Sequence, residues 1–118
     1  MSTFDGKRVL VVEDEPVVAM CLEDILDGLG CVTIGPASRL AEGLALAQAG
    51  GLDAAILDIN LGGERSNAIA EALRQQAVPF AFASGYGACP DGFDEDTPLI
   101  EKPYREAEVV AALIRLLV

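Results

Sequence analysis

Four apolar runs of the chain are each followed by polar side chains that could carry chemistry. These are Glu13, Asp14 and Glu15 after the first run, Asp58 and Asn60 after the second, Ser84 after the third, and Glu101 and Lys102 after the last. Crowded carboxylates raise one another's pKa unless a cation neutralises them. Mg²⁺ takes oxygen ligands and keeps several waters, so a few protein oxygens suffice. The candidate ligands are the side chains of Glu13, Asp14 and Asp58 and the backbone carbonyl of Asn60.

The same residues suit the transfer of a phosphoryl group onto a carboxylate. A bound metal ion and the compact charge of Lys102 would stabilise the transferring group, while Asp58 would act as the nucleophile. The charged product would attract the Ser84 hydroxyl, and the segment after Ser84 would move inward with it. The predicted product is therefore an aspartyl phosphate that switches the conformation of the chain.

Each of these residues also has a structural explanation. Asp14 stands just before a predicted helix and is as suitable for an N-cap as for a metal ligand. Ser84 in a glycine-rich turn is ordinary, and Lys102 could be a solvated strand end. Asp58 lies too far from the helix expected after Ser66 to cap it, so a functional role is favoured there.

The elements that would position these side chains follow from the hydrophobic pattern. Short apolar runs alternate five times with segments of helical periodicity, which predicts an α/β fold: a doubly wound five-stranded parallel sheet with helices on both faces. The expected strands are Arg8–Val12, 31–35, 54–57, 80–83 and 99–100, and helices are expected from Glu15, after Ser38, after Ser66 and from Tyr104. Residues 84–98 are expected to hold at most a short helix. Ligands of such sheets bind beyond the carboxyl ends of the strands, where the polar side chains would meet.

Two helices have apolar residues that define a predicted buried face. In the first helix these are Val17, Val18, Cys21, Leu22, Ile25 and Leu29, and in the last helix they are Val109, Val110, Leu113, Ile114 and Leu117. Residues at this spacing share one side of a helix. We expect both sets to pack against the sheet.

Length and composition exclude several classes of function. The 118 residues predict one domain, 1–118, and the net charge of −11 disfavours direct binding to nucleic acid or to an anionic membrane. The chain has no His, which excludes imidazole-based nucleophile systems, and its three Cys have no CxxC spacing. The first apolar run is too short for a signal peptide or a membrane span. A cytoplasmic protein with reduced thiols is expected.

Four segments together resemble a known family, the receiver domains of two-component response regulators. They are Val11-Val-Glu-Asp-Glu15, Leu57-Asp-Ile-Asn-Leu-Gly-Gly63, Phe82-Ala-Ser-Gly85 and Glu101-Lys-Pro-Tyr104. The resemblance covers the whole chain and implies a flavodoxin-like (βα)5 receiver fold. The run Phe-Ala-Ser-Gly-Tyr-Gly is similar to the single-domain subgroup nicknamed FATGUY, with Ser where Thr is usual.

The resemblance also implies a role for each matching residue. Glu13 and Asp14 correspond to magnesium ligands, Asp58 to the phosphoacceptor, Ser84 to the switch hydroxyl and Lys102 to the phosphate-contacting lysine. Pro103 and Tyr104 are supporting residues, and the Lys102–Pro103 bond is expected to be cis.

The chain departs from the family at three places. Leu99 stands where the family commonly has a switching aromatic residue, so Tyr86 and Tyr104 are the nearest aromatics that could report the state. Gly62 replaces a common Pro, and the fourth helix is reduced to Gly-Ala-Cys-Pro-Asp-Gly. We expect partner recognition to differ from that of the commonest members.

The expected function is that of a phosphoacceptor in a two-component phosphorelay, and not of an enzyme beyond its own phosphoryl transfer and autodephosphorylation. The donor would be a phosphohistidine of a sensor histidine kinase or a histidine phosphotransfer protein, with Mg²⁺ as the cofactor. With no output domain after Val118, the output would be contact with a downstream protein, a shuttle or sink role, or activity within a longer chain.

Three other functions could use a sheet of this kind. A flavin-binding module would have to hold phosphate at the acidic residues 13–15, which repel it. An aspartate phosphohydrolase would want a second Asp where Asn60 stands. A receiver-like interaction module that is never phosphorylated remains the main alternative.

Overall fold

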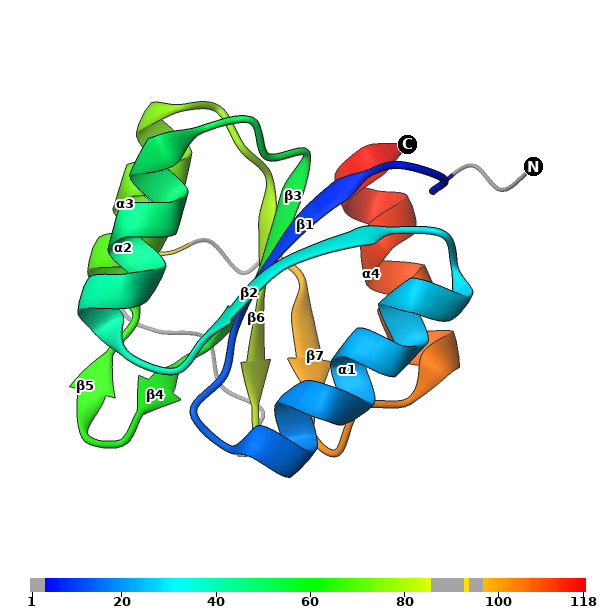
Figure 1. The fold of residues 1–118 in the computed structure, drawn as a ribbon, viewed down its shortest axis with the longest axis horizontal. Helices are drawn as coiled ribbons and strands as arrows, with labels where there is room; N and C mark the ends of the chain where they lie inside the picture. Colours follow the sequence, from blue (N-terminus) through cyan, green and yellow to red (C-terminus); the bar gives the residue numbers. More distant parts are fainter. Residues whose placement is uncertain (1–3, 86–92, 94–96) are drawn as a thin grey trace.

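Five parallel strands form one sheet in the order β2-β1-β3-β6-β7 (Figure 1). The computed structural model describes residues 4–85, 93 and 97–118. The strands are β1 (Arg8–Val12), β2 (Val32–Ala37), β3 (Ala54–Asp58), β6 (Phe80–Ser84) and β7 (Leu99–Glu101). The central strand β3 is buried along its whole length, as expected for a strand covered on both faces.

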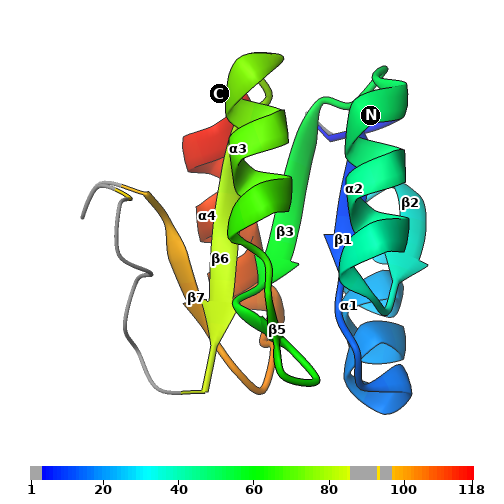
Figure 2. The same cartoon turned by 90° about the vertical axis from the view of Figure 1, so that its left-hand side faces the viewer.

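Helices cover both faces of the sheet, which confirms the predicted doubly wound architecture. They are α1 (Pro16–Gly28), α2 (Leu40–Ala49), α3 (Asn67–Gln75) and α4 (Glu106–Leu117). The first and last helices lie on one face, and α2 and α3 lie side by side on the other (Figures 1 and 2). The predicted remnant of a further helix falls mostly on residues 86–92 and 94–96, which lie outside the described residues. Among the described helices, none is both long and apolar enough to cross a membrane.

Several element boundaries differ from the sequence predictions. Strands β3 and β6 each run one residue further, so that Asp58 and Ser84 are the last residues of their strands. Strand β2 extends to Ala37 because its pairing with β1 shifts register and passes over the cis bond between Gly35 and Pro36. A proline is tolerated there because β2 is an edge strand and the register shift removes the need for its N–H.

Three helix starts were also predicted too early, and α1 begins at Pro16 rather than at Glu15. Helix α2 begins after Arg39, which takes the N-cap position expected for Ser38. Helix α4 begins after Arg105, so Tyr104 lies in the connection from β7 and not in the helix. The extended backbone of Arg39 and Arg105 marks both boundaries.

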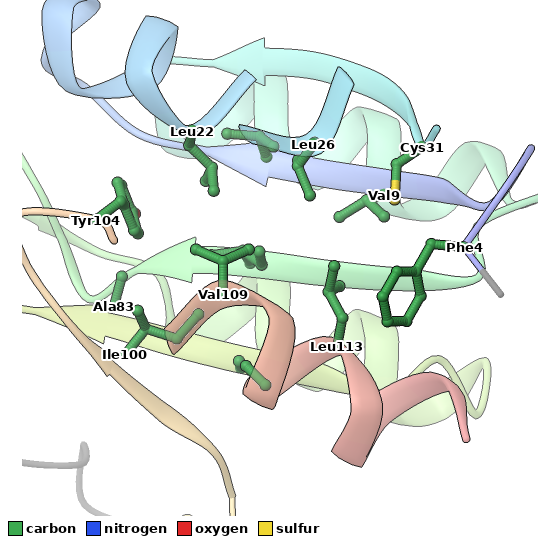
Figure 3. Packing of buried hydrophobic residues seen from close by; sticks show 14 residues of the cluster. Phe4, Val9, Leu22, Leu26, Cys31, Ala83, Ile100, Tyr104, Val109 and Leu113 are labelled. Carbon is green, nitrogen blue, oxygen red and sulfur yellow. The ribbon is translucent and has the colours of Figure 1, made fainter. Parts of the chain in front are cut away.

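The hydrophobic core has two halves, one on each face of the sheet. The half between the sheet and helices α1 and α4 includes Leu22, Leu26, Val109 and Leu113 (Figure 3). The other half packs α2 and α3 against Leu10, Val12, Leu57 and Phe82. The central strands therefore contribute side chains to both halves of the core.

The predicted buried face of α1 was wrong in part. The buried residues are Ala19, Leu22 and Leu26, whereas Val17 is 79% exposed and Cys21 is exposed. Val17 and Leu26 are nine residues apart, about half a turn out of phase at 3.6 residues per turn, so both cannot face the sheet. In α4, likewise, Ala112 is buried and Ile114 is 48% exposed.

A small hairpin after β3 was not predicted from the sequence, which indicated only a glycine-containing loop. Strands β4 (Asn60–Leu61) and β5 (Glu64–Arg65) pair antiparallel through Gly62 and Gly63, both at positive φ. Such a two-residue turn favours glycine. The Asn60 Oδ1 atom accepts a hydrogen bond from the Gly63 N–H at 3.0 Å. The hairpin lies at the end of the sheet where the strands finish (Figure 2).

Candidate functional site

The carboxyl ends of four strands bring the predicted site residues to one edge of the sheet. Glu13 follows β1 and is held there by the hydrogen bond from its N–H to the Ala37 carbonyl at 2.9 Å. Asp58 ends β3, and Ser84 ends β6. Lys102 follows β7, and its N–H donates to the Ser84 carbonyl at 3.0 Å. The convergence expected from the strand pattern is therefore present.

Lys102 joins the two buried carboxylates of this edge. Its Nζ atom lies 3.1 Å from Asp58 Oδ2, 3.1 Å from Glu13 Oε1 and 3.4 Å from Glu13 Oε2. Glu13 is 2% exposed and Asp58 is 5% exposed. Buried charges are stable only when they are paired and hydrogen-bonded, which makes the lysine essential to this arrangement.

Asp14 completes a group of three acidic side chains that could hold a metal ion. One carboxylate oxygen from each of Glu13, Asp14 and Asp58 lies within 4.8 Å of the others. Oxygen-only donors at the edge of a half-open site fit the preference of Mg²⁺ for a few carboxylates together with water. The capping explanation of Asp14 was wrong, because Glu15 is the N-cap residue of α1.

The remaining predicted ligand, the Asn60 carbonyl, stays a prediction. Asn60 is exposed on β4, next to the acidic group along the chain, and its side chain serves the hairpin turn.

Burial is the largest influence on the pKa values of the two central carboxylates. Burial, and secondarily the charge of Asp58, raise the pKa of Glu13 to about 7. Burial also raises the pKa of Asp58, although the hydrogen bonds from Lys102 oppose the rise. For Lys102, burial acts to lower the pKa, but the hydrogen bonds to Asp58 and Glu13 outweigh it and the pKa rises. Three carboxylates thus share one lysine, and a divalent cation would favour their ionised forms.

Ser84 and Lys102 lie at the carboxyl ends of their strands, where the sequence predicted. Ser84 is buried at the end of β6, and the Lys102–Pro103 peptide bond is cis, as expected. Leu99 pairs in register with Phe82 on β6. Tyr86, one of the two aromatics considered as a reporter of the state, lies outside the described residues.

Tyr104 makes a contact that the sequence did not predict. Its hydroxyl donates to Glu13 Oε1 at 3.3 Å, and the residue is 5% exposed. Burial, reinforced by the charge of Glu13, raises the pKa of Tyr104 well above its ordinary value, so the hydroxyl stays protonated. The only signal in the sequence was the position of Tyr104 two residues after Lys102.

A cavity of about 310 Å³ opens beside the acidic group and was also unforeseen. It lies between the β4–β5 hairpin and the start of α2, and its walls include Asp14, Arg39, Leu61 and Glu64.

The sheet order, the helices on both faces and the acidic group at the strand ends place this molecule among the receiver domains of response regulators. Residues 9–114 match the response regulator receiver domain family, and the chain belongs to that family. It is 34% identical, over an alignment of 118 residues, to the phyllosphere-induced regulator PhyR of Methylorubrum extorquens, covering 93% of this chain and 43% of that protein. The chain thus spans less than half the length of this curated relative.

Two solved structures are similar over nearly the whole chain. One is SdrG from Sphingomonas melonis Fr1, 43% identical with a TM-score of 0.80 and 100% of both chains covered. The other is the receiver domain of PhyR from Erythrobacter litoralis, 28% identical with a TM-score of 0.83, covering 96% of this chain and 91% of that one. The likeness includes sequence as well as fold.

Proposed function

We propose that this domain accepts a phosphoryl group on Asp58 from a phosphohistidine donor, with Mg²⁺ bound at Glu13, Asp14 and Asp58. The observation that carries the proposal is the link from Lys102 to both Asp58 and Glu13, at 3.1 Å each, beside the third carboxylate. Membership of the receiver family supports the same assignment.

The transfer can be written from the residues present. A carboxylate oxygen of Asp58 forms a bond to phosphorus while the bond between phosphorus and the donor's imidazole nitrogen breaks. The electron pair of that bond stays with the imidazole, which leaves as a neutral ring because its other nitrogen already carries a proton. Bound Mg²⁺ would supply charge neutralisation to the transferring oxygens. Lys102, already in contact with Asp58, would exchange its bond to Glu13 for one to a phosphoryl oxygen.

The conformational response would start at Ser84. Its hydroxyl would move toward the phosphoryl oxygens, and its carbonyl is already tied to the Lys102 N–H, so the ends of β6 and β7 would shift together. Attack by water on the acyl phosphate would release inorganic phosphate and restore the Asp58 carboxylate.

The partners that fit this chemistry are proteins. A sensor histidine kinase or a histidine phosphotransfer protein would supply the phosphoryl group, and a downstream protein would recognise the switched state. The net charge of −11 argues against nucleic acid as the direct partner. We place the reaction in the cytoplasm, where such donors are available.

Intact-mass measurement tests the proposal directly. Wild-type protein treated with acetyl phosphate should gain one phosphoryl group when Mg²⁺ is present and none when it is chelated. Asp58→Asn should gain nothing, whereas Asp24→Asn, an exposed aspartate on α1, should behave as the wild type. If the wild type gains nothing under any condition, the phosphorylation-independent interaction module becomes the better account.

A further inference from the structure

The Tyr104 side chain combines a core position with a polar contact to the site. Its ring belongs to the buried cluster beneath α1 and α4, together with Leu22, Ile100 and Val109 (Figure 3). A phenylalanine would satisfy that packing as well. The hydroxyl is therefore the part of Tyr104 that the core does not require, and its partner is Glu13 Oε1.

Three donors from two connections hold the Glu13 carboxylate. Oε1 accepts from Lys102 at 3.1 Å and from Tyr104 at 3.3 Å, while Oε2 accepts from the Glu15 N–H at 3.3 Å and from Lys102 at 3.4 Å. Lys102 is shared with Asp58, so its hold on Glu13 depends on the state of the acceptor. The Tyr104 hydroxyl donates to Glu13 and can keep this carboxylate in place when the lysine turns away.

We propose that Tyr104 is a positioning residue of the metal site, whose hydroxyl orients the Glu13 carboxylate for Mg²⁺. This inference rests on the proposed function, because it assumes that Glu13 takes part in metal binding. Groups that hydrogen-bond a ligating carboxylate fix its orientation, and their loss typically weakens metal binding by about 10- to 100-fold. The contact of 3.3 Å is long for an O–H···O bond. We therefore expect an effect at the lower end of that range.

The test measures the Kd for Mg²⁺ by isothermal titration calorimetry, which needs no phosphorylation. Tyr104→Phe keeps the ring and removes only the hydroxyl, and its Kd should rise by about tenfold. The same substitution in a Glu13→Ala background should change the Kd by less than about twofold, because the group that Tyr104 orients is gone. Val109→Ala is the matched control: it disturbs the same cluster without touching Glu13, so it should lower the Tm and leave the Kd unchanged.

Three results would overturn the inference. They are a Kd for folded Tyr104→Phe within about twofold of the wild type, an equal loss in the Glu13→Ala background, and the same loss in Val109→Ala. The proposed function fails separately, when the wild type neither binds Mg²⁺ nor gains a phosphoryl group. If the wild type is phosphorylated and the Kd of Tyr104→Phe is unchanged, the inference is wrong and the proposed function still stands.

Discussion

Burial and the nearby charge of Asp58 act together on the Glu13 carboxyl group. Its carboxyl group has an ordinary pKa near 4.5, and in the folded protein the pKa rises to about 7. Between these two values the folded chain binds a proton that the unfolded chain has released. The free energy of unfolding must therefore fall as the pH rises across this interval, in the absence of metal.

We predict this slope in urea denaturation series at pH 4.5 to 7 with a chelator present. The wild type should lose stability as the pH rises, and Glu13→Gln should lose clearly less because its amide does not titrate. Stability that is constant or rising with pH in the wild type would show that Glu13 is not destabilised by ionisation.

At the scale of elements, the sequence predicted the strands well and the connections poorly. The positions of Asp58 and Lys102 at one edge of the sheet could be predicted, because the end of a buried strand fixes where the adjacent polar residue lies. The contact of Tyr104 with Glu13 could not be predicted, since it joins residues 91 positions apart through packing. The β4–β5 hairpin was missed because its strands have two residues each, too few to show a period of two.

Helix faces were predicted less well than strands for a related reason. Apolar residues such as Val17 lie on exposed sides of helices, and a helical pattern alone does not distinguish them from buried ones. The side of a helix that is buried is the side that packs against the sheet. The position of the sheet relative to each helix is a property of the folded chain.

Strand β2 contains a glycine that the sheet requires. Gly35 has φ of +98°, and a Cβ atom there would lie 2.8 Å from the Ala37 nitrogen and 3.0 Å from the Val11 carbonyl oxygen. Gly63, in the hairpin, has a similar φ of +97° but nothing within 4 Å of such an atom. Substitution of Gly63 therefore tests backbone strain alone, whereas substitution of Gly35 tests the same strain together with a steric clash.

We predict that Gly63→Ala lowers the free energy of unfolding by about 1 kcal/mol, from the left-handed backbone alone. Gly35→Ala should lose at least about 2 kcal/mol, because the clash with β1 and β2 adds to that cost. Equilibrium unfolding in urea measures both. Equal losses in the two variants would mean that β2 shifts to accept the methyl group.

At the scale of the whole molecule, the net charge of −11 and the acidic group both favour the binding of a divalent cation. Mg²⁺ that binds only the folded chain should stabilise it by about 2.7 kcal/mol at 100 times its Kd. For a domain of this size that corresponds to a rise in Tm on the order of 10 °C.

The measurement is a thermal melt with MgCl2 against NaCl of equal ionic strength, since any salt screens the repulsion among the surface carboxylates. The wild type should melt higher in MgCl2, and Asp14→Asn should show a smaller difference between the two salts. The same Tm in both salts would leave the acidic group without a metal-binding role.

The sheet order has a consequence for how the chain is made. Strand β2 pairs with β1, β3 then joins the other side of β1, β6 joins β3, and β7 joins β6. Each later strand of the described sheet is added at an edge that is still open, so a nascent chain can extend the sheet as it leaves the ribosome. Lys102 follows the last strand. Glu13 and Asp58 are thus synthesised before their counter-ion, and Lys102 is positioned to reach them only once β7 pairs with β6.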